Sequence, residues 1–130
     1  ANQLIDRLRI VFASPDIYAD NGDVESLLHR ILLTELKPYG TERFSLSGDP
    51  VRLSPRQARN LALVIHELAT NSAKYGSLSV VDGFLFVSWR MQGDEIIIDW
   101  KEKGRASGAN PENAKGFGTR LIETMVRDLK

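Results

Sequence analysis

A strip of polar side chains near the middle of the chain has the residue types that a nucleotide-phosphate site requires. Positions 66–76 read HELATNSAKYG, and at about 100° per residue of an α-helix Glu67, Asn71 and Lys74 share one strip. A neutral oxygen can complete a magnesium shell, a cation can balance phosphate charge, and a carboxylate can accept a proton or orient a nucleophile. The strip therefore predicts a nucleotide site, although a solvated helix face can show the same pattern.

His66 stands next to this strip but does not indicate a zinc site. The helical zinc-protease motif needs a second histidine four residues later, and position 70 is threonine. A lone histidine away from the core face is more often a surface or hydrogen-bonding residue than a catalytic one. We keep His66 as a catalytic candidate beside Glu67 and Lys74.

Two further clusters follow the strip. The first, WKEKG at positions 100–104, ends a β-rich run, so Glu102 could accept the amino group of a base edge while Gly104 permits close backbone approach. The second, GFGT at positions 116–119, precedes a helical pattern, where glycines let backbone N–H groups approach phosphates. Each cluster also has a plain interpretation, an exposed glutamate between lysines and a loop-to-helix turn. The chain lacks the GK[ST] of a P-loop, which excludes that NTPase class.

A long helix must position the strip. Ser54 is a suitable N-cap, Pro55 suits the first helical position and Gly76 can cap the C-terminus, so the helix should run to about Tyr75. One side of it is predicted to pack on a sheet, and that core face consists of Leu61, Val64, Ile65, Leu68 and Ser72.

The remaining elements surround this helix. Phe84 to Met91 and Glu95 to Trp100 are β-rich runs joined by Gln-Gly-Asp, which predicts a hairpin. The other predicted elements are two short strands and two helices: Arg43 to Ser47, Val51 to Leu53, Val24 to Leu36, and Leu121 to Leu129. This order of elements predicts an α+β two-layer sandwich.

Composition limits the classes of function. The 130 residues, 42% of them hydrophobic, suffice for one domain, and 17 basic residues balance 17 acidic ones, so charge gives no support to binding of nucleic acid or membrane. The absence of cysteine excludes disulfides and thiolate chemistry. No apolar run approaches the roughly 20 residues of a membrane span. The start at Ala1 suggests an excised piece of a larger protein, and the lack of cysteine fits the expected cytoplasmic location.

Taken in order and spacing, the three clusters resemble the asparagine box and the two glycine boxes of the histidine kinase ATPase domain, the Bergerat-type fold shared with DNA gyrase. The HWE family of bacterial sensor histidine kinases is the most similar branch. Its asparagine box has a histidine beside the glutamate and its first glycine box reads Trp-x-Glu, as do His66-Glu67 and Trp100-Lys101-Glu102 here. The resemblance covers about positions 53–122.

This resemblance implies a mixed sheet with helices on one face and a domain that transfers the γ-phosphoryl group of Mg-ATP to a histidine. Asn71 would ligate Mg²⁺, Glu67 would orient or deprotonate the acceptor histidine, and Lys74 would contact phosphate. Tyr75 would border the adenine, unless it packs under the helix instead.

The glycine boxes would complete the ATP site. Glu102 would replace the aspartate that usually binds the adenine amino group, and Gly104 would let the base approach the strand. The phosphate-side loop would be shaped by Gly116, Gly118 and Thr119. The family usually has Gly-Gly where this chain has Gly104-Arg105, which alters the lid and adds a cation there.

By the same resemblance, residues 23–130 would form the ATP-binding catalytic domain and residues 1–22 the tail of the upstream dimerisation and phosphoacceptor helices. Leu4, Leu8 and Phe12 can form a helical stripe consistent with such a tail. The acceptor histidine would lie in that separate domain, and a response regulator would be the downstream partner. No nucleic acid or membrane partner is expected.

Two alternatives stay open at this point. One is a serine kinase of the anti-sigma-factor type on the same fold, which would stand alone rather than follow a sensor. The other is a degenerate adaptor that binds no ATP and docks a response regulator, although such domains lose the boxes that this chain retains.

Overall fold

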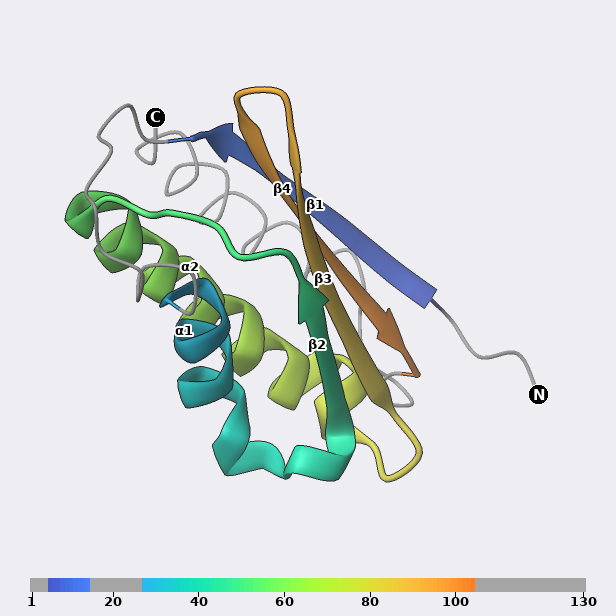
Figure 1. The fold of residues 1–130 in the computed structure, drawn as a ribbon. Helices are drawn as coiled ribbons and strands as arrows, with labels where there is room; N and C mark the ends of the chain where they lie inside the picture. The colour runs from blue at the N-terminus through green and yellow to red at the C-terminus, as the bar shows by residue number, and fades with distance from the viewer. Residues whose placement is uncertain (1–4, 15–26, 105–130) are drawn as a thin grey trace.

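In the part of the chain that the structure describes, two α-helices lie against one face of a four-stranded sheet (Figure 1). The computed structural model describes residues 5–14 and 27–104. The elements, in chain order, are β1 (Ile5–Ala13), α1 (Leu27–Leu36), β2 (Phe44–Gly48), α2 (Pro55–Tyr75), β3 (Phe84–Gln92) and β4 (Glu95–Lys103). Three short 3₁₀ turns are η2 (Lys37–Tyr39), η3 (Thr41–Arg43) and η4 (Ser77–Ser79).

The sheet is mixed. Its strand order is β1-β4-β3-β2, with β1 and β3 antiparallel to β4 and β2 parallel to β3. Helices on one side of a mixed sheet confirm the predicted α+β two-layer sandwich.

The predicted β3–β4 hairpin is confirmed. Its turn contains Gly93 at φ 60°, a left-handed conformation that glycine adopts without strain. The strand β4 continues past Trp100 to Lys103. Since successive side chains alternate between the faces of a sheet, Glu102 points to the same inner face as Trp100, which is buried.

The core lies between this inner face and the helices. The predicted core face of α2 is confirmed, because Leu61, Val64, Ile65, Leu68 and Ser72 are all buried. The four apolar residues of this face pack in one cluster with residues of α1 and the strands, among them Leu28, Leu32, Leu36, Val87, Ile98 and Trp100. No helix in the described ranges combines the length and apolarity needed to cross a membrane.

Both ends of α2 agree with the sequence prediction. Gln57 N donates to Ser54 Oγ and Ser54 N donates to Gln57 Oε1, each at 3.1 Å, so the two residues form a capping box. The side chain of Gln57 also donates from Nε2 to the carbonyl of Ala13 at 2.7 Å. This bond ties the first turn of α2 to the end of β1.

The first described residues correct the predicted helical stripe. Ile5–Ala13 is a strand, paired with β4 along its whole length. Leu8, Ile10 and Phe12 alternate toward the core, and Ile10 and Phe12 are buried. A helix built on Leu8 and Phe12 would leave Ile10 outside the stripe, whereas a strand buries it.

Two other predictions differ from the structure or fall outside it. Val51 to Leu53 is no strand in the structure, although Val51 and Leu53 are buried where the chain leads into α2. The start of the predicted helix from Val24, the boundary between residues 22 and 23, and everything after Gly104 lie outside the described residues.

The burial of Phe12 allows a direct test of the placement of β1 in the sheet. We expect Phe12→Ala to lower the free energy of unfolding by about 3 kcal/mol, because it removes a fully buried aromatic ring. Val11→Ala is the control, since Val11 lies on the opposite face of the same strand. Urea unfolding measures both variants, and a neutral Phe12→Ala would contradict the placement of β1 in this sheet.

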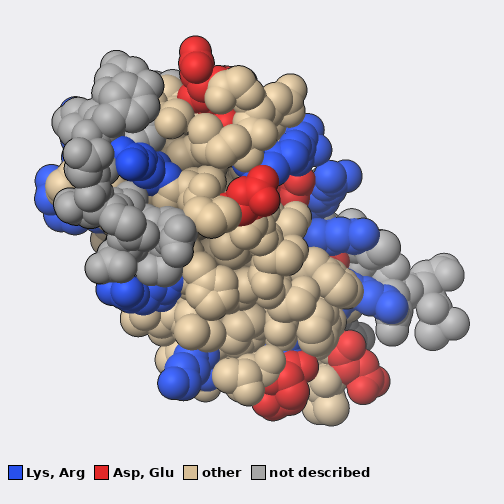
Figure 2. All heavy atoms as spheres, viewed as in Figure 1, with Lys and Arg blue, Asp and Glu red and all other residues tan. Residues whose placement is uncertain are grey.

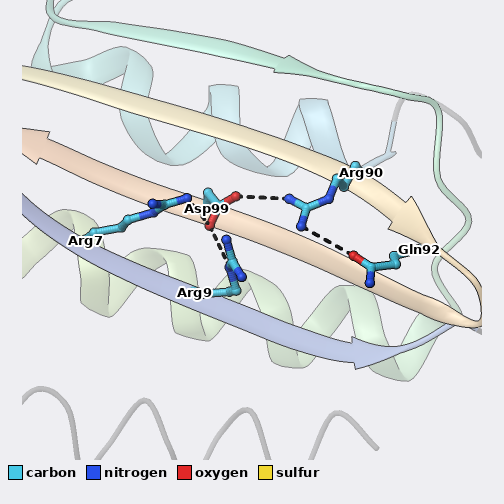
Figure 3. A network of polar contacts seen from close by, with 5 residues as sticks. All are labelled: Arg7, Arg9, Arg90, Gln92 and Asp99. Atoms are coloured by element: carbon cyan, nitrogen blue, oxygen red, sulfur yellow. Dashed lines mark hydrogen bonds and ion pairs between the residues drawn. The ribbon is translucent and has the colours of Figure 1, made fainter.

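The outer face of the sheet carries an ion-pair network around Asp99 (Figure 3). Arg9 Nε and Arg7 Nη2, from β1, lie 3.0 and 3.5 Å from Asp99 Oδ1, and Arg90 Nη1, from β3, lies 3.2 Å from Oδ2. Several basic side chains line the side of the molecule where the strands lie (Figure 2). The network therefore joins the three strands β1, β4 and β3 by charge as well as by backbone pairing.

Asp99 predicts a specific pH dependence. Burial alone would raise the pKa of Asp99, but the hydrogen bond from Arg9 and the charges of Arg9, Arg7 and Arg90 together hold it below the ordinary 3.8. A lowered folded-state pKa gives stability that is present above the unfolded-state value and is lost as the pH falls through the folded-state value.

We expect Asp99→Asn to lower the free energy of unfolding by about 1 kcal/mol at neutral pH, since its arginine partners are half exposed and each pair contributes little. The difference from wild type should shrink in acid, once the carboxyl is protonated in both states. Urea unfolding at neutral pH and in acid measures this, and a pH-independent difference would rule out the charge explanation.

Candidate functional site

The polar strip of α2 lies at the boundary between core and solvent. Glu67 and Asn71 are half-buried and Lys74 is exposed. Their chain neighbours Leu68 and Ser72 are buried, which fixes the rotation of the helix about its axis. The strip is therefore held in place by the core face beside it.

The three strip side chains have no side-chain partner in the part of the chain that the structure describes. Glu67, Asn71 and Lys74 make no side-chain hydrogen bond or ion pair with another residue in ranges 5–14 and 27–104. Within these ranges no three His, Asp or Glu side chains could hold a metal ion together. The Asn71 amide oxygen suits Mg²⁺, which usually takes one or two protein ligands and completes its shell with water and phosphate oxygens.

His66 faces α1 instead of joining the strip. Its Nδ1 lies 2.9 Å from Glu35 Oε1, and its side chain is 63% exposed. The contact gives His66 a role in joining α1 to α2. Its predicted catalytic role stays a prediction, as do those of Glu67 and Lys74.

Glu102 is not the solvated glutamate that its lysine neighbours suggest. Its Oε1 accepts hydrogen bonds from Ser72 Oγ, from Ser77 N at 3.0 Å and from Ser77 Oγ at 2.9 Å. Its Oε2 accepts from Trp100 Nε1 at 3.3 Å. Strand alternation explains the difference, because Lys101 and Lys103 are exposed on the other face.

These bonds bring the WKEKG cluster under the C-terminal end of α2. Ser72 is the residue after Asn71, so Glu102 is anchored directly beside the strip. Gly76 leaves room for this contact, because a Cβ there would lie 2.4 Å from Glu102 Oε1. The sequence pattern predicts Gly76 only as a helix cap.

The local backbone gives a structural reason for glycine at position 104. It adopts φ 88°, and a Cβ on it would lie 3.2 Å from the Cα of Gly83. The predicted close approach of a base at Gly104 is untested by this geometry. Tyr75 is 43% exposed, which contradicts the alternative that it packs under α2; its contact with adenine stays a prediction.

Sequence analysis missed three residues that shape this region. Ser72 and Ser77 hold Glu102, and Arg43 Nη2 donates to the carbonyl of Ser77 at 3.1 Å and to that of Val80. One signal was present in the sequence: Ser72 is polar on an otherwise apolar helix face, and a buried hydroxyl needs a partner.

The GFGT cluster at positions 116–119 lies outside the described residues. Gly116, Gly118 and Thr119, together with Arg105, are therefore not placed relative to α2. Their roles at the phosphates remain predictions.

Comparison with known proteins identifies similar chains. No model of a protein family matches. The chain is 39% identical over 116 residues, 85% of its length, to blue-light-activated histidine kinase 1 of Erythrobacter litoralis. It is 32% identical over 123 residues, 92% of its length, to a blue-light-activated histidine kinase of Rhizobium johnstonii, and 29% identical over 136 residues, 98% of its length, to one of Brucella ovis. It spans 32%, 35% and 28% of these three relatives.

Proposed function

We propose that this chain is the ATP-binding catalytic domain of a two-component sensor histidine kinase of the HWE type. In the proposed reaction the γ-phosphoryl group of Mg-ATP passes to a histidine on a separate dimerisation domain, and later to a response regulator. The similarity to histidine kinases supports the class of protein. Because the chain spans about a third of those relatives, the activity of the whole protein is part of the proposal.

One observation carries the ATP-binding part of this proposal. Glu102, a carboxylate with an acceptor position left on Oε2, lies under the same end of α2 that presents Asn71 and Lys74. A nucleotide needs a contact for its base at one end and charge balance for its phosphates at the other. The two clusters supply both kinds of group, and the hydrogen bond between Ser72 and Glu102 joins them directly beside Asn71.

Phosphoryl transfer depends mainly on positioning and on charge stabilisation, and the strip provides groups for both. Asn71 would offer its amide oxygen to Mg²⁺, which would supply charge neutralisation for the phosphates. Lys74 would add positive charge beside the γ-phosphate. Glu67 would orient the imidazole of the acceptor and take its proton as the new P–N bond forms and the bond to ADP breaks.

The identity of the acceptor residue tests the proposed reaction. We expect the full protein, given ATP labelled at the γ-position, to carry the label on histidine. A label on histidine is lost in acid and retained in base. A label that survives acid would indicate a hydroxyl acceptor and favour the serine kinase. An adaptor that binds no ATP is not favoured, because Glu67, Asn71 and Lys74 are all present and their side chains are unpaired among the described residues. A domain that uses ATP would work in the cytoplasm.

A further inference from the structure

The two carboxylate oxygens of Glu102 are held very differently. Oε1 receives hydrogen bonds from Ser72 Oγ, Ser77 N and Ser77 Oγ. Oε2 has one described partner, the Trp100 indole N–H at 3.3 Å. A carboxylate oxygen has about two lone-pair positions, so Oε1 is saturated and Oε2 can accept another bond.

The direction of these bonds follows from their neighbours. Ser72 Oγ already accepts from Leu78 N at 3.2 Å, so its hydroxyl hydrogen is left to point at Glu102. Ser72 is 1% exposed and Ser77 is 0% exposed, which keeps water from replacing these donors. Oε1 therefore faces only donors, and the carboxylate is held as an acceptor in one orientation.

We propose that Ser72 and Ser77 are positioning residues that make the site select adenine over 6-oxopurines. This inference rests on the proposed nucleotide function. With Oε1 occupied, Oε2 accepts from the amino group at position 6 of adenine. Hypoxanthine and guanine present a carbonyl oxygen at that position, so two acceptors would face each other and both would lose a partner.

The first test compares ATP with inosine triphosphate, which carries hypoxanthine, in the presence of Mg²⁺. We expect wild type to bind ATP at least about 100-fold more tightly. In Ser72→Ala/Ser77→Ala the ratio should fall by about tenfold or more, because Glu102 is no longer fixed. Ser88→Ala, on the exposed outer face of β3, is the control and should keep the wild-type ratio. An unchanged ratio in the double variant overturns the inference.

A second variant, Glu102→Gln, should shift the preference between the two triphosphates in the opposite direction. In Glu102→Gln the serine donors should hold the amide oxygen at the Oε1 position, so that the NH₂ group takes the place of Oε2, loses the bond from Trp100 Nε1 and turns toward the base. Preference should then move toward inosine triphosphate, whose carbonyl can accept from that NH₂ group. If ATP stays preferred as strongly as in wild type, Glu102 does not read the base. Ser77→Ala alone serves where the double variant does not fold, since it leaves the Ser72 acceptor for Leu78 N intact.

The two tryptophans provide a readout that needs no nucleotide. Trp100 donates to Glu102 Oε2, whereas the Trp89 indole donates to the Asp49 carbonyl at 2.7 Å. In Ser77→Ala we expect the Trp100 indole N–H resonance to shift and that of Trp89 to stay. Two unmoved resonances overturn the positioning role. A shifted Trp100 in a chain that binds neither triphosphate overturns the proposed function instead, and base selection with it.

Discussion

Asn71→Ala is expected to abolish the magnesium-assisted binding of a non-hydrolysable ATP analogue. Asn71 is half-buried on α2 and its side chain is unpaired among the described residues, so its amide oxygen is free to ligate Mg²⁺. Without this oxygen we expect affinity in the presence of magnesium to fall by about 1000-fold, equivalent to about 4 kcal/mol. Isothermal calorimetry with and without Mg²⁺ measures this.

Thr70→Ala is the matched control for that variant. Thr70 is the preceding residue of α2, and its Oγ1 donates back to the His66 carbonyl of the same helix at 2.9 Å. Its removal should leave nucleotide affinity unchanged. If Asn71→Ala kept wild-type affinity and its response to magnesium, the main assignment of the site would be wrong.

Glu67→Gln is expected to slow phosphotransfer and to spare nucleotide binding. The amide keeps the size of the side chain but cannot take a proton, and a positioned general base typically contributes about 10²–10⁴-fold to a rate. We expect the single-turnover rate of histidine phosphorylation in the full protein to fall by about 1000-fold, in the middle of that range.

Glu35→Gln separates the contribution of Glu67 to the phosphotransfer rate from any contribution of the neighbouring His66. Glu35 pairs with His66 across the two helices, so its change perturbs His66 while leaving Glu67 intact. A normal rate in Glu35→Gln with a slow rate in Glu67→Gln assigns the proton transfer to Glu67. An unchanged rate in Glu67→Gln would show that Glu67 is not the base.

The elements that sequence analysis predicted well are those specified by local signals. α2 has a serine cap, a proline in its first turn and a continuous apolar period, and the β3–β4 hairpin has alternating strands around Gly93. These signals lie within a few residues of the structure that they specify. They also place Glu67, Asn71 and Lys74 on one strip before any tertiary contact is known.

β1 could not be predicted in the same way, because its sequence is compatible with two periods. Leu8 and Phe12 fit a helix, whereas Leu8, Ile10 and Phe12 fit a strand. The choice depends on pairing with β4, about ninety positions later in the chain. Periodicity within nine residues contains no information about that partner.

The serine contacts to Glu102 are hidden from sequence for a related reason. They join residues 25 and 30 positions apart, across the end of a helix and the end of a strand. The spacing WKEKG places Glu102 at a strand end but does not show which donors face it. Val51 and Leu53 illustrate the opposite case, where apolar residues are buried in a connection without forming a strand.

A calorimetric titration of the wild-type chain with a non-hydrolysable ATP analogue, with and without Mg²⁺, tests the central claim most directly. We expect saturable binding at one site that becomes about 1000-fold tighter with magnesium, a difference of about 4 kcal/mol that matches the loss expected for Asn71→Ala. Absence of binding at millimolar ligand would contradict the ATP-binding assignment. The strip on α2 and the Glu102 contacts would then be features of the fold that a phosphotransfer adaptor retains.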